Sequence, residues 1–550
     1  MNQKASHPTD SEQTRLLRGL LQPRAYPHEV GGVERIETHI STVLLAGAYA
    51  YKIKKPVNLG FLDFSSLELR RHYCEEELRL NRRLAPRLYI EVVSILGGMD
   101  APRIGPHHAP GAIEYAVRMQ RFAQSALLDR MLASGALEPR HLDALAATVA
   151  AFHARIDHAA SSRDAGADVD FGTPASIEAP MRQNFEQIRP LLESREELAA
   201  LKRLEDWSIA AHVELAPLMA ERRRDGYVRE CHGDLHLGNI TWIDGEIQVF
   251  DCIEFNPSLR WIDVASEIAF SVMDLAARGR PDWGARLLNS YLEITGDYAA
   301  LKLLRYYLVY RAMVRAKVAR LRAAQTEEAT AEAGLHRELL ADYAAHLRLA
   351  TGFMAPQATV LIVTHGVSGS GKTTLTQPLL ERMGALRLRS DVERKRLFGL
   401  AREARSGPEF NARLYAGAAS QDTYAELRRV AALALAAGYP VIVDATFPRR
   451  GWRDSFRELA VELRVPFLIL DCRADAAELR RRVAQRLSIG QDASEATLAV
   501  LERQLLEDQA LTAEEAEYAI VIDTQHVAPD EMLAQVRRRL IPGFSALDDG

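Results

Sequence analysis

The sequence predicts two successive folds: an α+β domain over residues 1–350, then an α/β domain with a parallel sheet over residues 356–550. Short apolar strand patterns dominate the first 120 residues, and helical patterns then continue to about Arg348. After the helix-breaking segment TGFMAPQAT, short apolar strands alternate with helices, which is typical of a parallel sheet covered on both faces. The chain of 550 residues is also too long for one hydrophobic core, so more than one domain is expected.

Composition and charge indicate an ordinary globular protein. Hydrophobic residues make up 48% of the chain and charged residues 26%. The formal net charge of −5 does not favour nucleic acid as a partner, although local basic runs keep it possible. No secretory signal is visible, and no apolar run approaches the roughly 18 residues of a membrane span. The four cysteines form no CxxC pair, so we expect a cytoplasmic protein without a membrane partner.

The first domain is expected to contain a small strand-rich lobe over about 25–120 and a helical lobe over about 121–350. IETHISTVLLAGAYAYKIKK predicts two strands with a turn at Ala46–Gly47. SSLELRRHYCEEELRLNRRL predicts a helix with Ser65 or Ser66 as its N-cap. YIEVVSIL and AIEYAVRMQRF add further strands to this lobe.

The segment HGDLHLGNITWIDGEIQVFDCIE, residues 232–254, contains the first chemical motif. Four residues separate Asp234 from Asn239, and Asp251 follows a predicted strand–turn–strand with its turn at Asp244–Gly245. Phosphoryl transfer requires a carboxylate that orients and deprotonates a hydroxyl, and oxygen ligands that hold magnesium against the nucleotide phosphates. One loop and its adjoining hairpin can supply both. The spacing equals that of the kinase loop H-R-D-x-x-x-x-N, with Gly in place of Arg.

HGDLHLGN followed by FDCIE resembles the aminoglycoside phosphotransferase and choline kinase-like branch of the protein-kinase fold. The resemblance implies that Asp234 is the catalytic base and that Asn239 and Asp251 are metal ligands. It also implies a catalytic lysine on a strand of the small lobe and a glutamate on the following helix. We interpret His232 and His236 as structural, because a hydroxyl-directed kinase needs only one base.

Candidates for this lysine and glutamate are present in the small lobe. AYAYKIKK offers Lys52, in the position of the lysine of V-A-I-K, and Lys54 on the same strand face is the alternative. Glu77 lies among apolar positions of the predicted helix, with Glu75 and Glu76 as alternatives. No G-x-G-x-x-G precedes the lysine strand, so the phosphate contacts of this lobe are unassigned.

The second chemical motif, GVSGSGKTT, matches G-x-x-x-x-G-K-[ST] between an apolar strand and a helix. Its glycines let backbone N–H groups surround phosphate at a helix N-terminus. We expect Lys372 to reach the β- and γ-phosphates and the Thr373 hydroxyl to bind magnesium. The residues expected to bind nucleotide are Gly366, Val367, Ser368, Gly369, Ser370, Gly371, Lys372, Thr373 and Thr374.

The rest of this half resembles small P-loop kinases of the gluconate-kinase, zeta-toxin and polynucleotide-kinase kind. The resemblance implies that Asp391 is a catalytic carboxylate facing substrate or magnesium, and that Asp444 is a Walker-B-type metal ligand. RRRVAQRLSIGQDASEA resembles the lid of such kinases, with Arg482 and Arg486 one helical turn apart. These catalytic arginines would neutralise charge on the transferred phosphoryl group. A solvated charged helix face is the alternative interpretation.

Together the motifs resemble a bacterial family that fuses an aminoglycoside phosphotransferase-like domain to an AAA, or zeta-toxin-like, P-loop domain. The implied fold is an α+β protein-kinase-like domain followed by an α/β P-loop NTPase domain. The implied activity is ATP- and Mg²⁺-dependent phosphoryl transfer at two nucleotide sites, to hydroxyls of small molecules or nucleotides. The acceptor has no signature in the sequence. Two alternatives are a P-loop ATPase that regulates a kinase-like partner domain, and a P-loop kinase that acts on RNA or a nucleotide-sugar.

Overall fold

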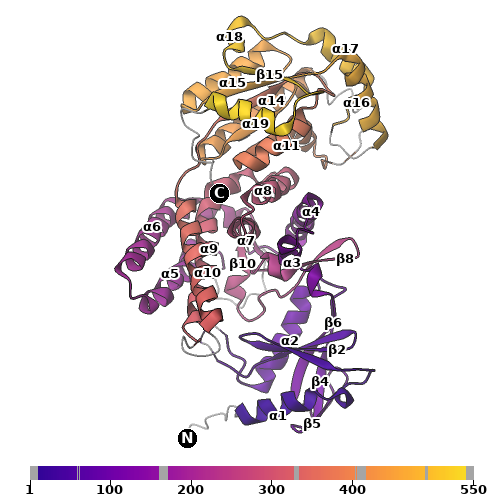
Figure 1. Ribbon diagram of the computed structural model, residues 1–550, viewed down its shortest axis with the longest axis vertical. Coiled ribbons are helices and arrows are strands. Elements are labelled where there is room, and N and C mark those ends of the chain that lie inside the picture. Colours follow the sequence, from indigo (N-terminus) through magenta and orange to yellow (C-terminus); the bar gives the residue numbers. More distant parts are fainter. Residues whose placement is uncertain are drawn as a thin grey trace. The chain divides into compact units, whose positions relative to one another are not determined.

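The computed structural model describes residues 10–58, 60, 62–159, 171–326, 333–402, 404, 417–489 and 494–540 (Figure 1). Contacts between Cα atoms divide the chain into two compact units. The first comprises Met1–Gln183 and His212–Ser271, and the second comprises Asn184–Ala211 and Val272–Gly550. Within the described ranges, no helix combines the length and the apolar character that crossing a membrane requires.

A six-stranded antiparallel sheet forms the small lobe of the first unit, in the order β1-β2-β3-β6-β4-β5. Alternate residues of the four inner strands enter two apolar cores, so that Tyr51 and Ile53 of β3 face one core and Ala50 faces the other. The strands are β1 (Val33–Glu37), β2 (Ser41–Ala46), β3 (Tyr49–Lys54), β4 (Tyr89–Gly98), β5 (Ala101–Ile104) and β6 (Glu114–Gln120). Helices α1 (Asp10–Leu20) and α2 (Leu67–Asn81) each contribute to one of the two cores.

The structure of the small lobe differs from one strand prediction and identifies which of the two candidate serines is the N-cap of α2. The segment expected to form two strands contributes to three, because β1 ends at Glu37 and a turn at Thr38 precedes β2. β1 was missed because its VERIE sequence is polar and four of its five residues are exposed. Ser66, one of the two candidate N-caps of α2, accepts a hydrogen bond from Leu69 N at 3.2 Å.

The rest of the first unit is mainly helical around a small hairpin. The hairpin of β8 (Ile240–Ile243) and β9 (Glu246–Val249) turns at Asp244 and Gly245, both with positive φ, as the sequence predicts. The helices are α3 (Leu128–Ala133), α4 (Pro139–Arg155), α5 (Pro174–Ile188), α6 (Arg195–Arg224) and α7 (Val264–Ala277). The C-terminal parts of α5 and α7 and the N-terminal part of α6 belong to the second unit. Strand β7 (Val228–Glu230) pairs with β10 (Trp261–Asp263). The described 3₁₀ helices are η1 (Pro23–Ala25), η2 (Gln124–Ala126), η3 (Arg189–Leu191), η4 (Leu237–Asn239), η5 (Pro257–Leu259) and η6 (Tyr298–Ala300).

Three helices precede the α/β domain in the second unit: α8 (Pro281–Thr295), α9 (Leu301–Ala323) and α10 (Ala333–Met354). The sequence indicates that Gly352 interrupts the last helix, but α10 continues through it to Met354. Arg305 of α9 donates hydrogen bonds to the carbonyls of Phe353 and Met354, which satisfies the end of the helix. Pro356 follows and cannot continue it.

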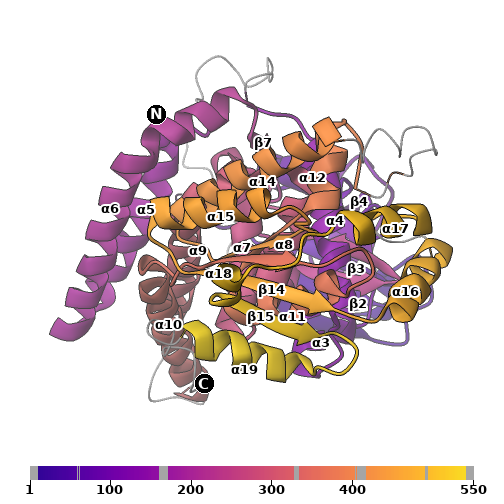
Figure 2. The same cartoon turned by 90° about the horizontal axis from the view of Figure 1, so that it is seen from above.

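A five-stranded parallel sheet forms the core of the α/β domain, as predicted. Its order is β12-β13-β11-β14-β15, with β11 (Leu361–His365), β12 (Leu386–Arg389), β13 (Val441–Asp444), β14 (Phe467–Arg473) and β15 (Ala519–Asp523). Helices α11 (Lys372–Met383) and α19 (Pro529–Leu540) pack on one face, and α14 (Gly417–Ala436) and α15 (Arg450–Leu463) lie on the other (Figure 2). The remaining described helices are α12 (Ser390–Leu397), α16 (Ala476–Ile489), α17 (Leu498–Glu507) and α18 (Ala513–Ala516).

The central strand β11 lies between β13 and β14. The chain passes from β11 to β12 and β13 on one side of it and then crosses from β13 to β14 on the other side. Open α/β sheets bind ligands at the carboxyl ends of the strands beside such a reversal. The loop that begins at Gly366 follows β11 directly, and Asp444 ends the neighbouring strand β13. The topology therefore places both residues at one edge of the sheet.

Candidate functional site

Lys52 on β3 and Glu77 on α2 form a buried ion pair in the small lobe. Lys52 Nζ donates a hydrogen bond to Glu77 Oε1 at 2.8 Å and also contacts the Asp251 carboxylate. Strand alternation explains this direction, because Tyr51 and Ile53 enter the opposite core. Burial raises the pKa of Glu77, but the two neighbouring lysine ammonium groups outweigh it and lower this pKa to about 2. Glu77 is therefore ionised near neutral pH.

Lys54, the alternative lysine, belongs to the same cluster, but its side chain contacts only the buried part of it. Its Nζ donates to Glu77 Oε2 at 2.8 Å and contacts Glu254, and all three side chains are at most 3% exposed. Lys52 instead reaches Asp251, whose side chain is 44% exposed. Of the two lysines, Lys52 is therefore the one beside solvent-accessible space that a nucleotide could enter.

Hydrogen bonds from Asn239 and to Glu267 hold the loop that contains Asp234. Asn239 Nδ2 donates to Asp234 O at 3.0 Å and to Asp234 Oδ2 at 2.9 Å. Glu267 of α7, which is buried, accepts hydrogen bonds from the backbone N–H of His232 at 2.6 Å and of Gly233 at 3.0 Å. Such charge-assisted bonds are strong in a buried setting, so Glu267 fixes the position of the loop. The sequence gives no signal for this role, because Glu267 lies in an apolar helix beyond the motif.

The two histidines of this loop bind backbone groups. His232 is buried, its Nε2 lies 2.9 Å from Phe250 O, and burial lowers its pKa to about 4. His236 Nδ1 accepts a hydrogen bond from Gly238 N at 3.1 Å and caps η4. His236 Nε2 also lies 3.4 Å from Asp234 Oδ2, so the interpretation of both histidines as structural stays a prediction.

Asp251 adopts a left-handed backbone conformation, with φ of +64°. This region is costly for a residue other than glycine and is common at functional sites. Phe250 N donates to Asn239 O at 3.0 Å, and Asp251 N donates to Tyr89 Oη at 3.1 Å. The hairpin thus returns Asp251 to the Asp234–Asn239 loop. Carboxylate and amide oxygens at this point fit the preference of Mg²⁺ for hard ligands.

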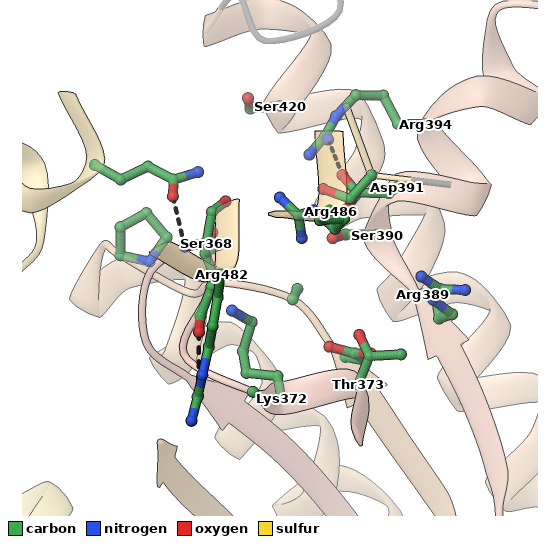
Figure 3. Close-up of a pocket in the computed structure, with 18 of the residues that line it drawn as sticks. Ser368, Lys372, Thr373, Arg389, Ser390, Asp391, Arg394, Ser420, Arg482 and Arg486 are labelled. Carbon is green, nitrogen blue, oxygen red and sulfur yellow. Dashed lines mark hydrogen bonds and ion pairs between the residues drawn. The ribbon is translucent and has the colours of Figure 1, made fainter. Parts of the chain in front are cut away.

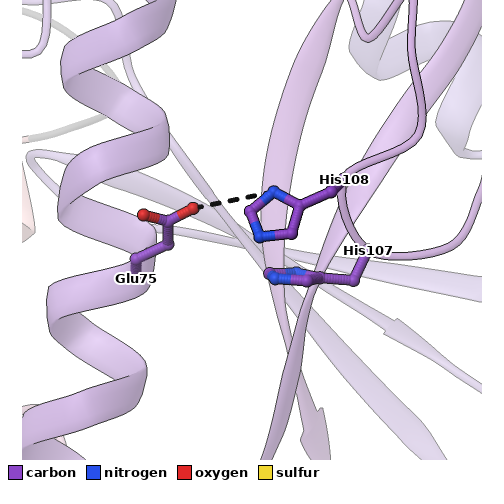
Figure 4. Close-up of side chains that lie close together, drawn as sticks. All are labelled: Glu75, His107 and His108. Atoms are coloured by element: carbon purple, nitrogen blue, oxygen red, sulfur yellow. Dashed lines mark ion pairs between the residues drawn. The ribbon is translucent and has the colours of Figure 1, made fainter.

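Glu75, His107 and His108 form a separate cluster on the small lobe, with ligand atoms within 4.8 Å of one another (Figure 4). The Arg71 guanidinium donates to Glu75 at 2.9 Å and also contacts His108 Nδ1. A fixed positive charge against two of the three groups disfavours a metal ion here. Glu76 likewise pairs with an arginine of its own helix. Neither Glu75 nor Glu76 therefore takes the place of Glu77 beside Lys52.

The glycine-rich loop after β11 has a conformation that requires glycine. Gly366 has φ of +128°, and a Cβ atom there would lie 2.4 Å from Cys472 O. Gly371 precedes α11 with φ of +85°, so the backbone N–H groups of the first helical turn are presented at its N-terminus. Lys372 Nζ donates to Gly366 O at 2.9 Å and to Val367 O at 2.8 Å. Figure 3 shows this side chain at the base of a pocket of about 660 Å³.

Thr373 and Asp444 supply adjacent oxygens in the same pocket. Thr373 Oγ1 donates a hydrogen bond to Asp444 Oδ2 at 2.6 Å, and Asp444 is 5% exposed. One comes from the first turn of α11 and the other from the end of β13, so the fold itself brings them together. A hydroxyl and a carboxylate so placed fit a magnesium ion that also binds nucleotide phosphates.

Asp391, at the start of α12, faces the same pocket (Figure 3). It pairs with Arg394 one turn later, with 2.8 Å between Oδ1 and Nη1. Burial raises the pKa of Asp391, but Arg394 and a hydrogen bond from Ser494 outweigh it and hold this pKa below its usual value. The carboxylate is therefore ionised at neutral pH and available to orient a hydroxyl group.

Arg482 and Arg486 of α16 both line the pocket. Arg482 donates to Gly369 O at 3.3 Å and to Thr524 Oγ1 at 2.9 Å, while Arg486 donates to Ala496 O at 3.5 Å. Their direction argues against a purely solvated helix face. Part of the segment that resembles a lid, residues 490–493, lies outside the described residues.

The pocket also contains residues that sequence reasoning missed. Arg389 ends β12, Arg394 lies on α12, and Arg449 immediately precedes α15. Two of them flank Asp391 in LRLRSDVERKRL, but alternating charge in a strand and helix does not show which side chains share a pocket. In the first unit Glu254 was similarly missed, although it belongs to the FDCIE segment.

Comparisons with known proteins match both halves of the chain. The model of the phosphotransferase enzyme family matches residues 62–304, and that of an AAA domain matches residues 361–511. Uncharacterized proteins of Mycobacterium tuberculosis (strain ATCC 25618 / H37Rv) and Mycobacterium bovis are 30% identical over 465 residues. These alignments cover 84% of this chain and 88% of each relative.

Two solved structures illustrate the more distant likenesses. A choline/ethanolamine kinase family protein from Mesorhizobium loti is 12% identical, with 62% of this chain and 98% of that chain covered and a TM-score of 0.35. A gluconokinase from Sinorhizobium meliloti is 20% identical, with 35% and 94% covered and a TM-score of 0.24. The order of the two family domains and the extent of the mycobacterial alignments agree with the resemblance that the motifs indicate. The chain belongs to the family of ATP-dependent phosphotransferases in which a phosphotransferase enzyme domain is fused to an AAA P-loop domain.

Proposed function

We propose that the protein has two phosphotransferase sites, each of which binds Mg-ATP and transfers its γ-phosphoryl group to a hydroxyl of a small molecule or nucleotide. The observation that carries this proposal is the bonding of Lys52 Nζ to both Glu77 and Asp251. These residues lie 25 and 199 positions from Lys52 in the sequence. A domain that served only as a scaffold would not need this arrangement beside the Asp234–Asn239 loop.

In the first site Asp234 acts as the base. The acceptor oxygen forms a bond to the γ-phosphorus while the bond from that phosphorus to the bridging oxygen of ADP breaks, and the hydroxyl proton passes to Asp234. Asn239 holds the Asp234 carboxylate in place through its Nδ2 donor. Lys52 would bind phosphate oxygens while Glu77 keeps its ammonium group oriented. Magnesium bound to Asn239 and Asp251 would neutralise phosphate charge.

In the second site Asp391 has the same role toward its acceptor. The loop from Gly366 to Thr374 surrounds the phosphates with backbone N–H groups, and Lys372 supplies a positive charge. Thr373 and Asp444 would hold magnesium, and the lid arginines Arg482 and Arg486 would stabilise charge on the transferred group. The proton of the acceptor hydroxyl passes to Asp391, and ADP is the leaving group.

The test uses the full chain with one site inactivated at a time. Lys372→Ala inactivates the second site, so that the products come from the first. Asp251→Asn inactivates the first site, so that the products come from the second. Each variant is incubated with Mg-ATP and a metabolite library, and phosphorylated products are detected by their mass shift. Arg538→Gln, an exposed change on α19, is the matched control for a lost side-chain charge.

We expect each variant to lose a different set of products and the double variant to lose all of them. Product formation that persists in the double variant would contradict both site assignments. If the Lys372→Ala protein makes no product and binds no nucleotide, the first half is not a phosphotransferase. The alternative in which the P-loop half is an ATPase that regulates the kinase-like half would then be preferred.

A further inference from the structure

The pocket of the P-loop half contains more positive charge than its nucleotide requires. Seven lysine and arginine side chains line it, against three carboxylates. A magnesium-bound triphosphate offsets part of this excess. Lys372 and Arg482 bond to carbonyls of the phosphate loop and are cations that the donor nucleotide would engage, although Arg482 also pairs with Glu478. Figure 3 shows Arg486 nearer to Asp391. The remaining arginines are concentrated elsewhere in the pocket.

Three of these arginines form what we term the acceptor wall, defined by Arg389, Arg394 and Arg449 together with Asp391. They come from the end of β12, from α12 and from the residue before α15. Asp391 is the one carboxylate among these four residues, so the wall has a net positive charge at neutral pH. Figure 3 shows Arg389 and Arg394 on the Asp391 side of the pocket, away from Lys372.

Two features of the wall indicate a prepared binding surface. Arg394 is 7% exposed and pairs with Asp391 at 2.8 Å, so its guanidinium is fixed beside the carboxylate that faces the pocket. The Arg449 guanidinium lies over the Trp452 ring at 5.2 Å, and Trp452 stacks on Tyr424 at 4.0 Å. This aromatic stack restricts the Arg449 side chain at the rim of the pocket.

We propose that the acceptor of the second site is a small hydroxylated molecule with an anionic group, either a phosphate monoester or a carboxylate. Arg389, Arg394 and Arg449 hold the anion while the hydroxyl lies at Asp391. Guanidinium groups match phosphate and carboxylate with paired hydrogen bonds, which a neutral polyol does not offer to the same extent. The pocket of about 660 Å³ includes the phosphate loop as well as the wall, and its volume is typical of small-molecule sites.

This inference rests on the proposed nucleotide site, so the test occupies that site first. The full chain is saturated with Mg²⁺ and a non-hydrolysable ATP analogue, which blocks the phosphate loop. Inorganic phosphate is then titrated at constant ionic strength and followed by its ³¹P NMR line width. Arg389→Gln and Arg449→Gln each remove one cation of the wall, and Arg538→Gln is the control outside the pocket.

We expect phosphate to bind the analogue-saturated protein and each wall variant to weaken this binding about tenfold, the usual effect of losing one charge-assisted hydrogen bond. Arg538→Gln should bind phosphate like the unmodified chain. Competition with acetate distinguishes the two possible anionic groups of the acceptor. If acetate displaces phosphate readily, the wall prefers a carboxylate, and if acetate displaces phosphate only weakly, the wall prefers a phosphate monoester. Both results support an anionic acceptor.

Two results would overturn the inference while leaving the proposed function intact. One is that the ATP analogue binds but phosphate and acetate do not. The other is that both wall variants bind phosphate as well as the control does. If the analogue itself fails to bind the P-loop half, as judged by no difference between the unmodified chain and Lys372→Ala, the proposed second site is wrong and this inference is wrong with it.

Discussion

At the scale of the residue, one carboxylate holds two buried cations in the small lobe. Glu77 is fully buried and bonds to both Lys52 and Lys54 at 2.8 Å. Each lysine has a second carboxylate, Asp251 or Glu254, yet only Glu77 joins the two. Burial lowers the pKa of Lys52, but Asp251 and Glu77 outweigh it and raise this pKa well above its ordinary value. Lys52 and Glu77 are therefore both charged, whereas burial raises the pKa of Glu254.

Glu77→Gln should strongly destabilise the protein, because it leaves two buried ammonium groups without their shared counter-charge. The expected loss in the free energy of unfolding is about 3–5 kcal/mol, the usual effect of breaking a buried ion pair. Glu75→Gln, on the same helix but in a partly exposed pair with Arg71, should change it by less than about 1 kcal/mol. Urea denaturation measures both. Equal effects of the two changes would contradict the central role of Glu77.

The roles of Asp234 and Asp251 predict two different failures. Asp234→Asn should retain Mg-ATP binding and lose phosphoryl transfer, because it removes the proton acceptor but not a metal ligand. Asp251→Asn should weaken magnesium-dependent nucleotide binding itself, because a charged ligand of a hard cation is lost. Calorimetry in a Lys372→Ala background reports the first site alone. The assignment is wrong if Asp234→Asn reduces affinity more than Asp251→Asn does.

At the scale of the element, the turn between β11 and α11 depends on backbone conformation rather than on side-chain chemistry. Gly366→Ala would place a Cβ atom 2.4 Å from Cys472 O at a φ that other residues rarely adopt. We expect a loss of about 1–3 kcal/mol in stability and a marked loss of ATP binding, since the loop must move. Gly451→Ala, in α15, has nothing within 4 Å of the added atom and should have little effect or a stabilising one. Thermal unfolding and nucleotide titration distinguish the two, and a Gly366→Ala protein that binds ATP normally would contradict the prediction.

At the scale of the whole molecule, the division between domains is not a simple cut at the linker. Within the second unit, Tyr298 Oη donates to Glu393 Oε1 at 2.6 Å, and Asn289 Oδ1 accepts from Arg387 N at 2.7 Å. Tyr298 and Asn289 precede the linker in the sequence, while Glu393 and Arg387 belong to the α/β domain. The domain ranges 1–350 and 356–550 remain a prediction, and these contacts give a way to test them.

A fragment that starts at Pro281 should unfold at a higher temperature than one that starts at Pro356. The shorter fragment loses the buried hydrogen bond that Tyr298 donates to Glu393 and the one that Asn289 accepts from Arg387 N, each worth about 1 kcal/mol. For a domain of this size, the expected difference in Tm is several degrees, about 2–4 °C for each kcal/mol. Calorimetry of both fragments measures it. The same Tm for the two fragments would show that the helices before the linker add nothing to the stability of the α/β domain.

Sequence alone was sufficient wherever a motif is local. The loop GVSGSGKTT, the hairpin turn at Asp244–Gly245 and the five parallel strands each follow from residues adjacent in the chain, because glycine conformations and apolar runs act over a few positions. The edge strand β1 was missed for the opposite reason. Its polar sequence lacks an apolar pattern, and only pairing with β2 makes it a strand.

Only the tertiary structure decided which side chains meet. The sequence favours Lys52 and keeps Lys54 on the same strand face as the alternative. In the structure they differ because Lys52 reaches the half-exposed Asp251 and Lys54 the buried Glu254. Glu267 holds the Asp234 loop from a helix that no motif marks. The arginines of the acceptor wall come from three separate elements. Such contacts join residues that are distant in sequence, and short-range patterns contain no information about how the intervening chain folds back.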